Sequence, residues 1–129
     1  MNKTILIVDD EELTLMLTES ALSVKYNTIR ALSGEEAIKQ YVLYQPDLVV
    51  ADVMMPGMDG FEMLAEMKNR FGRRIPIIFM TANETEETEI KGLQYGAVDF
   101  MRKPLKPDQL LGSVNSFIER MEQIKNMQQ

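Results

Sequence analysis

The chain alternates between short apolar runs and longer stretches in which apolar residues recur at helical spacing, and this alternation limits the fold more than any other feature. Five runs rich in β-branched residues predict strands at 4–8, 27–31, 47–51, 75–80 and 97–100. The first, third and fourth runs are almost continuously apolar, which is typical of strands covered on both faces of a parallel sheet. The second and fifth are more polar, as expected of edge strands.

Two of the intervening helices have a predicted core-facing side. In the first helix, residues spaced by three and four positions are expected to face the core; they are Leu13, Met16, Leu17, Ser20, Ala21 and Val24. In the third helix, which spans about 59–71 and ends at Gly72, the corresponding residues are Phe61, Leu64, Ala65 and Met67.

Capping residues indicate where the other helices begin. Ser33, followed by Glu36 three residues later, has the pattern of a capping box at the start of the second helix. The fourth helix is predicted to begin at Asn83 or Glu84 with an acidic first turn, which favours a helix N-terminus. The fifth is predicted to begin near Pro107, because proline is tolerated in the first turn of a helix.

Five strand–helix units in succession predict an α/β fold. Right-handed crossovers then give a doubly wound, five-stranded parallel sheet with helices on both faces, a (βα)5 arrangement of the flavodoxin-like type. The strand order 2-1-3-4-5 places the three most apolar strands in the interior. At 129 residues the chain is expected to form one domain. Ligands of such sheets bind beyond the carboxyl ends of the strands, so the residues that follow each run are the candidates for chemistry.

The composition excludes several kinds of chemistry and partner. The sequence contains no Cys and no His, which excludes disulfides, thiolate or imidazole metal sites, and Ser-His or Cys-His catalysis. With 14 basic and 20 acidic residues the formal net charge is −6, which argues against nucleic acid as a direct ligand. No run is long enough to span a membrane or to serve as a secretory signal, so we expect a cytoplasmic protein that does not bind membranes.

Polar side chains follow the predicted strands and are expected to converge at one edge of the sheet. Asp9 and Asp10 follow the first strand, Asp52 the third, Thr81 the fourth, and Lys103 lies just beyond the fifth. Three carboxylates so close together repel each other unless a cation binds them, and oxygen ligands alone favour a hard ion such as Mg²⁺. An ammonium and a hydroxyl beside a carboxylate could hold phosphoryl oxygens while that carboxylate attacks phosphorus.

Five motifs, taken in order, resemble those of response-regulator receiver domains, the CheY-like family of two-component signalling. The resemblance covers about residues 3–120. Each motif is weak alone, but their order and their positions at strand ends are together very specific. The motifs are Asp9-Asp10-Glu11, the segments 47–60, 76–82 and 96–100, and Lys103-Pro104.

The resemblance implies a role for each residue at this edge. Asp52 would be the phosphoacceptor. Asp9 and Asp10, together with Asp52 and the backbone carbonyl of Met54, would hold Mg²⁺, with Mn²⁺ as a substitute. Phosphoryl oxygens would be bound by two residues, Thr81 and Lys103.

The resemblance also implies a switch and a set of partners. Phe100 would move with Thr81 on phosphorylation and so remodel the face formed by the fourth helix, the fifth strand and the fifth helix. The donor would be a sensor histidine kinase or a histidine phosphotransfer protein, and the output would be a domain or partner outside this chain. Such a domain is not a general enzyme, because it catalyses only its own phosphorylation and dephosphorylation. Met54 and Asn83 occupy positions that tune dephosphorylation, and the Lys103-Pro104 peptide would be cis.

Other functions fit the sequence less well. A flavodoxin-type cofactor carrier would need a Gly-, Ser- or Thr-rich loop after the first strand, where this chain has four acidic residues. A phosphatase of the haloacid dehalogenase type would place its nucleophile after the first strand rather than the third. The remaining alternative is a pseudo-receiver that keeps the fold and only binds other proteins, although all the site positions are filled.

The C-terminal region extends beyond the receiver pattern. We assign residues 1–120 to the receiver domain and 121–129 to a helical extension or linker stub. The apolar residues of this last helix are spaced 4, 3, 4 and 3, which is typical of a coiled coil; they are Leu110, Val114, Phe117, Met121 and Ile124. Self-pairing of this helix into a homodimer and a frayed terminal helix both remain open.

Overall fold

The computed structural model describes residues 2–82 and 85–127, in which five strands alternate with five helices. The strands are β1 (Thr4–Val8), β2 (Asn27–Ala31), β3 (Leu48–Asp52), β4 (Ile77–Thr81) and β5 (Asp99–Arg102). The helices are α1 (Glu12–Leu22), α2 (Gly34–Tyr44), α3 (Gly60–Phe71), α4 (Glu86–Gln94) and α5 (Pro107–Met127). In this part of the chain no helix is both long enough and apolar enough to cross a membrane.

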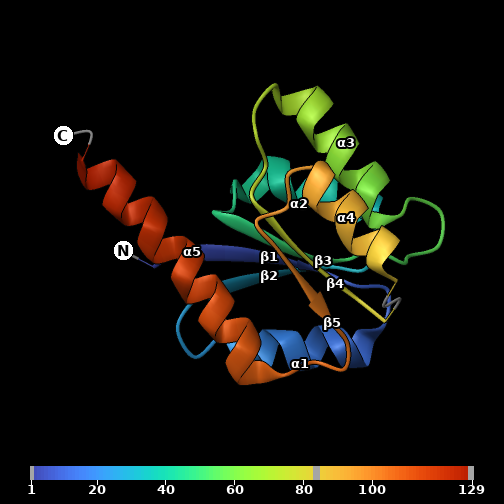
Figure 1. Ribbon diagram of the computed structural model, residues 1–129, viewed down its shortest axis with the longest axis horizontal. Coiled ribbons are helices and arrows are strands. Elements are labelled where there is room, and N and C mark those ends of the chain that lie inside the picture. Colours follow the sequence, from blue (N-terminus) through green and yellow to red (C-terminus); the bar gives the residue numbers. More distant parts are fainter. Residues whose placement is uncertain (1, 83–84, 128–129) are drawn as a thin grey trace.

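The strands form one parallel sheet in the order β2-β1-β3-β4-β5, which confirms the predicted topology. Helices α1 and α5 cover one face of the sheet, and α2, α3 and α4 cover the other (Figure 1). The two polar strands, β2 and β5, lie at the edges as predicted. Every residue of β3 and β4 is buried, since both strands are covered on both faces.

The core is divided in two by the sheet. Successive side chains of a strand point to opposite faces, so each interior strand contributes to both halves. In β1, Leu6 and Val8 pack with residues of α2 and α3, whereas Ile5 and Ile7 pack with residues of α1 and α5. The apolar runs of the sequence therefore fill both layers, which explains why they show no polar alternation.

Three strand boundaries differ from the prediction. Strand β4 begins at Ile77, because Pro76 has no N–H to donate to the ladder, although its carbonyl still accepts from the Val49 amide at 3.0 Å. Strand β5 is shifted by two residues, since Ile78 pairs with Asp99 and the ladder continues to Arg102. Strand β3 ends at Asp52 itself, so this side chain stands on regular sheet.

The predicted core-facing stripe of α1 is wrong. Leu13, Met16, Leu17 and Val24 are 68, 49, 50 and 75% exposed, Ser20 is exposed, and Ala21 is only partly buried. The residues that α1 buries are Leu15, Thr18 and Leu22. Apolar residues occur on more than one side of this helix, so spacing alone could not select the buried side. Thr18 is tolerated in the core because its hydroxyl donates to the Thr14 carbonyl at 2.8 Å.

Capping of α2 and α3 follows the predicted chemistry with one difference. The Ser33 hydroxyl accepts from the Glu36 amide at 3.1 Å, as predicted, but the Glu36 carboxylate accepts from the Leu32 amide instead of closing the box. A complete capping box occurs at α3, where Asp59 and Glu62 each accept from the other's amide. This box fixes the end of the loop that follows β3.

The remaining helices refine the predicted faces and ends. In α3 the buried side includes Phe61, Leu64 and Met67 as predicted, but Met63 is buried and Ala65 is exposed. The predicted start of α4 at 83–84 lies outside the described residues, and the helix begins at Glu86 after an N-cap residue, Thr85. Helix α5 begins at Pro107, as predicted.

Candidate functional site

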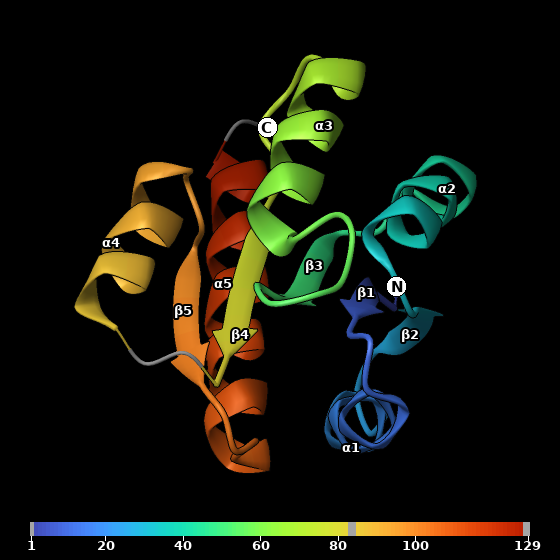
Figure 2. The same cartoon turned by 90° about the vertical axis from the view of Figure 1, so that its right-hand side faces the viewer.

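The predicted site residues lie at the carboxyl edge of the sheet. Asp9 follows β1, Asp52 ends β3, Thr81 ends β4 and Lys103 follows β5. Strands β4 and β5 run side by side and end at the same edge (Figure 2). Parallel strands thus bring together side chains that are up to 94 residues apart in sequence.

Lys103 connects two of the carboxylates. Its Nζ lies 2.9 Å from an oxygen of Asp9 and 2.8 Å from an oxygen of Asp52, and it lies 3.5 Å from a carboxylate oxygen of Glu11. The Lys103 side chain is only 11% exposed, so these interactions are poorly screened by solvent. The contact with Glu11 was not predicted, although Glu11 belongs to the acidic motif.

Backbone amides hold the other oxygens of these carboxylates. The Glu11 amide donates to Asp9 at 2.9 Å, and the Met54 amide donates to Asp52 at 3.0 Å. Asp9 and Asp52 are buried, whereas Asp10 is exposed. The Asp52 carboxylate is therefore fixed in orientation, with one oxygen bound to an amide and the other to an ammonium.

Burial and charge shift the pKa values of the central pair. Burial raises the pKa of the Asp52 carboxyl above its usual value, and the hydrogen bonds from Lys103 and Met54 oppose this rise only in part. Burial alone would lower the pKa of Lys103, but its hydrogen bonds to Asp52 and Asp9 outweigh burial and raise that pKa. Lys103 is thus a permanent cation beside Asp52 at neutral pH.

The acidic residues form a cluster that could hold a metal ion. One carboxylate oxygen from each of Asp9, Asp10 and Asp52 lies within 4.8 Å of the others. Carboxylate oxygens without nitrogen or sulfur ligands suit a hard divalent cation. Lys103 supplies one positive charge beside these three carboxylates and Glu11. The cluster therefore keeps an excess of negative charge, which also favours a cation.

Thr81 and Phe100 lie beside this cluster on adjacent strands. Thr81 is fully buried, and its carbonyl accepts from the Lys103 amide at 2.9 Å. The Phe100 ring is half-buried, with its centroid 6.4 Å from that of Phe79. On its α4 side Phe100 lies against Gly92, where a Cβ atom would come within 2.8 Å of the ring. Sequence reasoning missed this contact, because glycine within a helix gives no signal of what lies against it.

The loop after β3 approaches the site closely. Gly60 donates its amide to the Val53 carbonyl at 2.8 Å, and a Cβ at Gly60 would lie 2.6 Å from the Asp52 carbonyl oxygen. Glycine is therefore required at this position for α3 to begin next to Asp52. Met54 is 58% exposed at the mouth of the site.

Two further expectations concern residues outside this loop. The Lys103-Pro104 peptide is cis, as the resemblance implies. Asn83 lies outside the described residues.

Comparisons with known sequences place this arrangement among signalling proteins. The profile of the response regulator receiver domain matches residues 5–115. The alkaline phosphatase synthesis transcriptional regulatory protein PhoP of Bacillus subtilis is 39% identical over 123 residues, which cover 95% of this chain and 51% of that protein. The response regulator PleD of Caulobacter vibrioides is 37% identical over 118 residues, or 90% of this chain and 26% of PleD. The chain thus spans about half, or less, of these curated relatives.

Solved structures show the same fold. The receiver domain of a Francisella response regulator superposes with a TM-score of 0.84 at 28% identity, covering 93% of this chain and 99% of that one. The CheX-CheY-BeF3-Mg²⁺ complex of Borrelia burgdorferi gives a TM-score of 0.83 at 31% identity, covering 90% of this chain and 89% of the matched chain.

Proposed function

The chain belongs to the response regulator receiver domain family of two-component signalling, and we propose that it accepts a phosphoryl group on Asp52 from a phosphohistidine of a partner protein. The observation that carries this proposal is the position of the Asp52 carboxylate. It stands at the end of a central strand, is held by the Lys103 ammonium and the Met54 amide, and adjoins the acidic cluster.

In the proposed transfer, a carboxylate oxygen of Asp52 attacks the phosphorus atom. A new P–O bond forms as the P–N bond to the partner's imidazole breaks, and the imidazole nitrogen keeps the electron pair and takes up a proton. Attack by the carboxylate form of Asp52 needs no general base, so the absence of histidine from this chain is no obstacle. Lys103 and the Thr81 hydroxyl bind phosphoryl oxygens, and the later attack of water releases phosphate. The chain catalyses these two steps on itself alone.

The same proposal assigns a metal to the acidic cluster. Asp9, Asp10, Asp52 and the Met54 carbonyl would hold Mg²⁺, or Mn²⁺ in its place. A bound divalent cation supplies positive charge to the oxygens of the phosphoryl group. The all-oxygen donor set supports this assignment, as does the Mg²⁺ present in the CheX-CheY complex to which the chain is similar.

We extend the proposal to a conformational switch. Phosphorylation would draw Thr81 toward the phosphoryl group, and Phe100 would follow, changing the surface of α4, β5 and α5 for an output domain or partner outside this chain. The position of Phe100 between Phe79 and Gly92 supports this role, because a shift of the ring must change its contact with α4.

Intact mass spectrometry tests phosphoacceptance. The chain is incubated with Mg²⁺ and either acetyl phosphate or a histidine-phosphorylated kinase, and we expect it to gain one phosphoryl group. Asp52→Asn should abolish the gain. Asp47→Asn, which changes the exposed aspartate that precedes the same strand, is the matched control and should retain it. No gain with either donor would instead support a pseudo-receiver that only binds proteins.

A further inference from the structure

The C-terminal turns of α5 present an apolar surface at the edge of the sheet opposite the acidic cluster. The end of α5 extends past the sheet in Figure 1, and Met121 and Ile124 on these turns are 45 and 48% exposed. Two grooves run along this part of the helix and share four lining residues. We call these four the α5 terminal surface; they are Pro76, Phe117, Met121 and Ile124.

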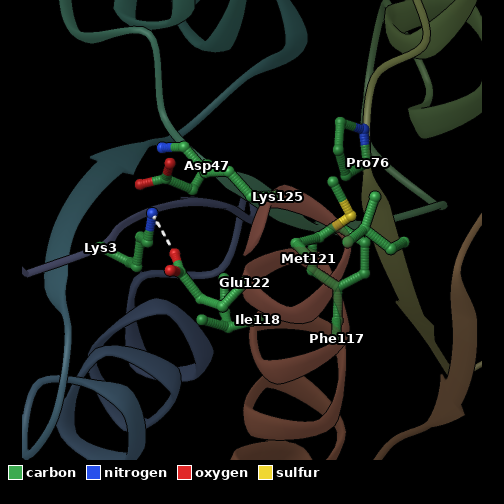
Figure 3. A pocket seen from close by; sticks show the side chains of 9 residues that line it. Lys3, Asp47, Pro76, Phe117, Ile118, Met121, Glu122 and Lys125 are labelled. Carbon is green, nitrogen blue, oxygen red and sulfur yellow. Dashed lines mark ion pairs between the residues drawn. The ribbon is translucent and has the colours of Figure 1, made fainter. Parts of the chain in front are cut away.

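The first groove faces the starts of β1 and β3. Figure 3 shows Met121 reaching toward Pro76 and Lys3 paired with Glu122. The Lys3–Glu122 distance is 2.7 Å, and Asp47 accepts from the Thr4 amide at 2.8 Å. Both acidic side chains of this groove therefore already have a partner. The Lys125 ammonium makes no ion pair with any residue in the described ranges.

The second groove faces the start of β5 and has a volume of about 480 Å³. Besides the α5 terminal surface it is lined by Ala97 and Val98, which extend the apolar floor, and by Arg74 and Arg120. Neither guanidinium forms an ion pair with a residue that the structure describes, and no acidic residue lines the groove. The α5 terminal surface is thus bordered by unpaired cations, in a chain with a net charge of −6.

These cations argue against a second copy of the chain as the occupant. In a coiled-coil heptad, Phe117 and Ile124 would occupy position d and Met121 position a. Arg120 then occupies the flanking position g, and Lys125 occupies the flanking position e. In a parallel pair Arg120 would face Lys125 of the other copy, and in an antiparallel pair each cation would face its own kind. Like charges at flanking positions disfavour pairing.

We propose that the α5 terminal surface binds an amphipathic helix of a partner protein. The apolar side of that helix would contact Met121 and Ile124. Its acidic residues would lie opposite Arg74, Arg120 and Lys125. The apolar contacts supply affinity, and the cations select an acidic partner. The proposal does not depend on phosphoacceptance, because this surface lies at the amino ends of the strands. The Asp52→Asn variant is therefore expected to bind the partner helix unchanged.

Two synthetic helical peptides of three heptads test the proposal. Both have leucine at the core positions, and one has glutamate and the other lysine at every flanking position. In fluorescence anisotropy at low ionic strength, we expect the glutamate peptide to bind roughly tenfold more tightly. In NMR spectra, the methyl signals of Met121 and Ile124 should shift on binding.

Charge reversal and a matched control sharpen the test. Arg120→Glu combined with Lys125→Glu should invert the preference between the two peptides. Ile124→Gln should weaken binding of the glutamate peptide by about tenfold, since it replaces an apolar side chain that the peptide would cover. Leu43→Gln changes a residue of α2 that is 72% exposed and should leave binding unaffected.

Three results would overturn the proposal. Equal affinity for the two peptides would show that charge does not select the partner, and absence of binding would show that the surface is not a docking site. Light scattering that finds a dimer of the chain, lost on Ile124→Gln, would identify a second copy as the occupant.

Discussion

Lys103 is the cation that joins Asp9 and Asp52, and its ammonium offsets part of the negative charge of the site. These two carboxylates are almost completely buried, at 1 and 4% exposure. Without the ammonium they would repel each other in a poorly solvated environment. The proposed phosphoryl transfer and the stability of this edge of the sheet would therefore depend on the same residue.

Replacing Lys103 by alanine should destabilise the chain by about 2–3 kcal/mol without divalent cations, since it leaves two buried carboxylates without their counter-ion. Urea denaturation monitored by circular dichroism measures this loss. Mg²⁺ should restore part of the stability by binding the freed carboxylates. Lys106→Ala, which changes an exposed lysine three residues later, is the control and should alter stability by less than about 0.5 kcal/mol. A Lys103→Ala variant as stable as the parent would contradict this view of the charge balance.

Gln45 has a left-handed backbone conformation at the end of α2. It caps α2 with a positive φ of 46°, a conformation that favours glycine. Gln45→Gly should raise the free energy of unfolding by about 0.5–1 kcal/mol in the same urea experiment. Ser23→Gly is the matched control, because Ser23 caps α1 with a φ of −69° and gains nothing from glycine. Equal effects of the two substitutions would mean that the left-handed backbone is not the cause.

At the scale of elements, α4 meets β5 through the contact of Gly92 with Phe100. A methyl group at Gly92 would lie 2.8 Å from the ring, so Gly92→Ala should lower stability by about 1–2 kcal/mol unless the ring moves. Combining it with Phe100→Leu should recover part of that loss, which a double-mutant cycle measures as a coupling energy. Gly112→Ala in α5, where nothing lies within 4 Å of the added atom, should instead stabilise the helix by about 1 kcal/mol. Additive effects at Gly92 and Phe100 would contradict the contact.

The end of α5 is tied to the start of β1 by the Lys3–Glu122 ion pair. The hydrogen bond from Lys3 lowers the pKa of Glu122 below its usual 4.5, so the folded state holds this proton less tightly than the unfolded chain. The stabilisation is therefore complete above pH 4.5 and is lost as the pH falls through the folded-state value. The amide protection factors of 121–127, which compare exchange rates measured by NMR with those of an unfolded chain at the same pH, should fall in that acidic range. Glu122→Gln should remove this fall; an unchanged pH profile of the protection factors in that variant would show that another group is responsible.

At the scale of the whole molecule, the sequence predicts the topology because each strand's polarity reflects its place in the sheet. The covered strands β3 and β4 carry a polar residue only at their carboxyl ends, Asp52 and Thr81, whereas the edge strands β2 and β5 carry more of them. Once the order is known, convergence of Asp9, Asp52 and Lys103 follows from the parallel direction of the strands. These parts of the prediction rest on properties that every parallel sheet shares.

The parts that could not be predicted depend on contacts between distant residues. The buried side of α1 includes Thr18 in place of Leu17. Apolar residues occur on several sides of this helix, and its packing against the sheet and α5 decides which side is buried. The interaction of Glu11 with Lys103 depends on side-chain positions that spacing cannot give. Arg74, which lies between α3 and β4, likewise joins Arg120 and Lys125 of α5 around Met121 only in the folded chain.

Mapping the phosphoryl group to a residue tests the central claim most directly. After incubation with Mg²⁺ and a phosphoryl donor, the chain is cleaved at acidic pH and its peptides are weighed by mass spectrometry. The account predicts the added phosphoryl group on the peptide that contains Asp52. Its presence on a peptide that contains Asp9 and Asp10, or its absence from every peptide, would contradict the assignment of Asp52 as the phosphoacceptor.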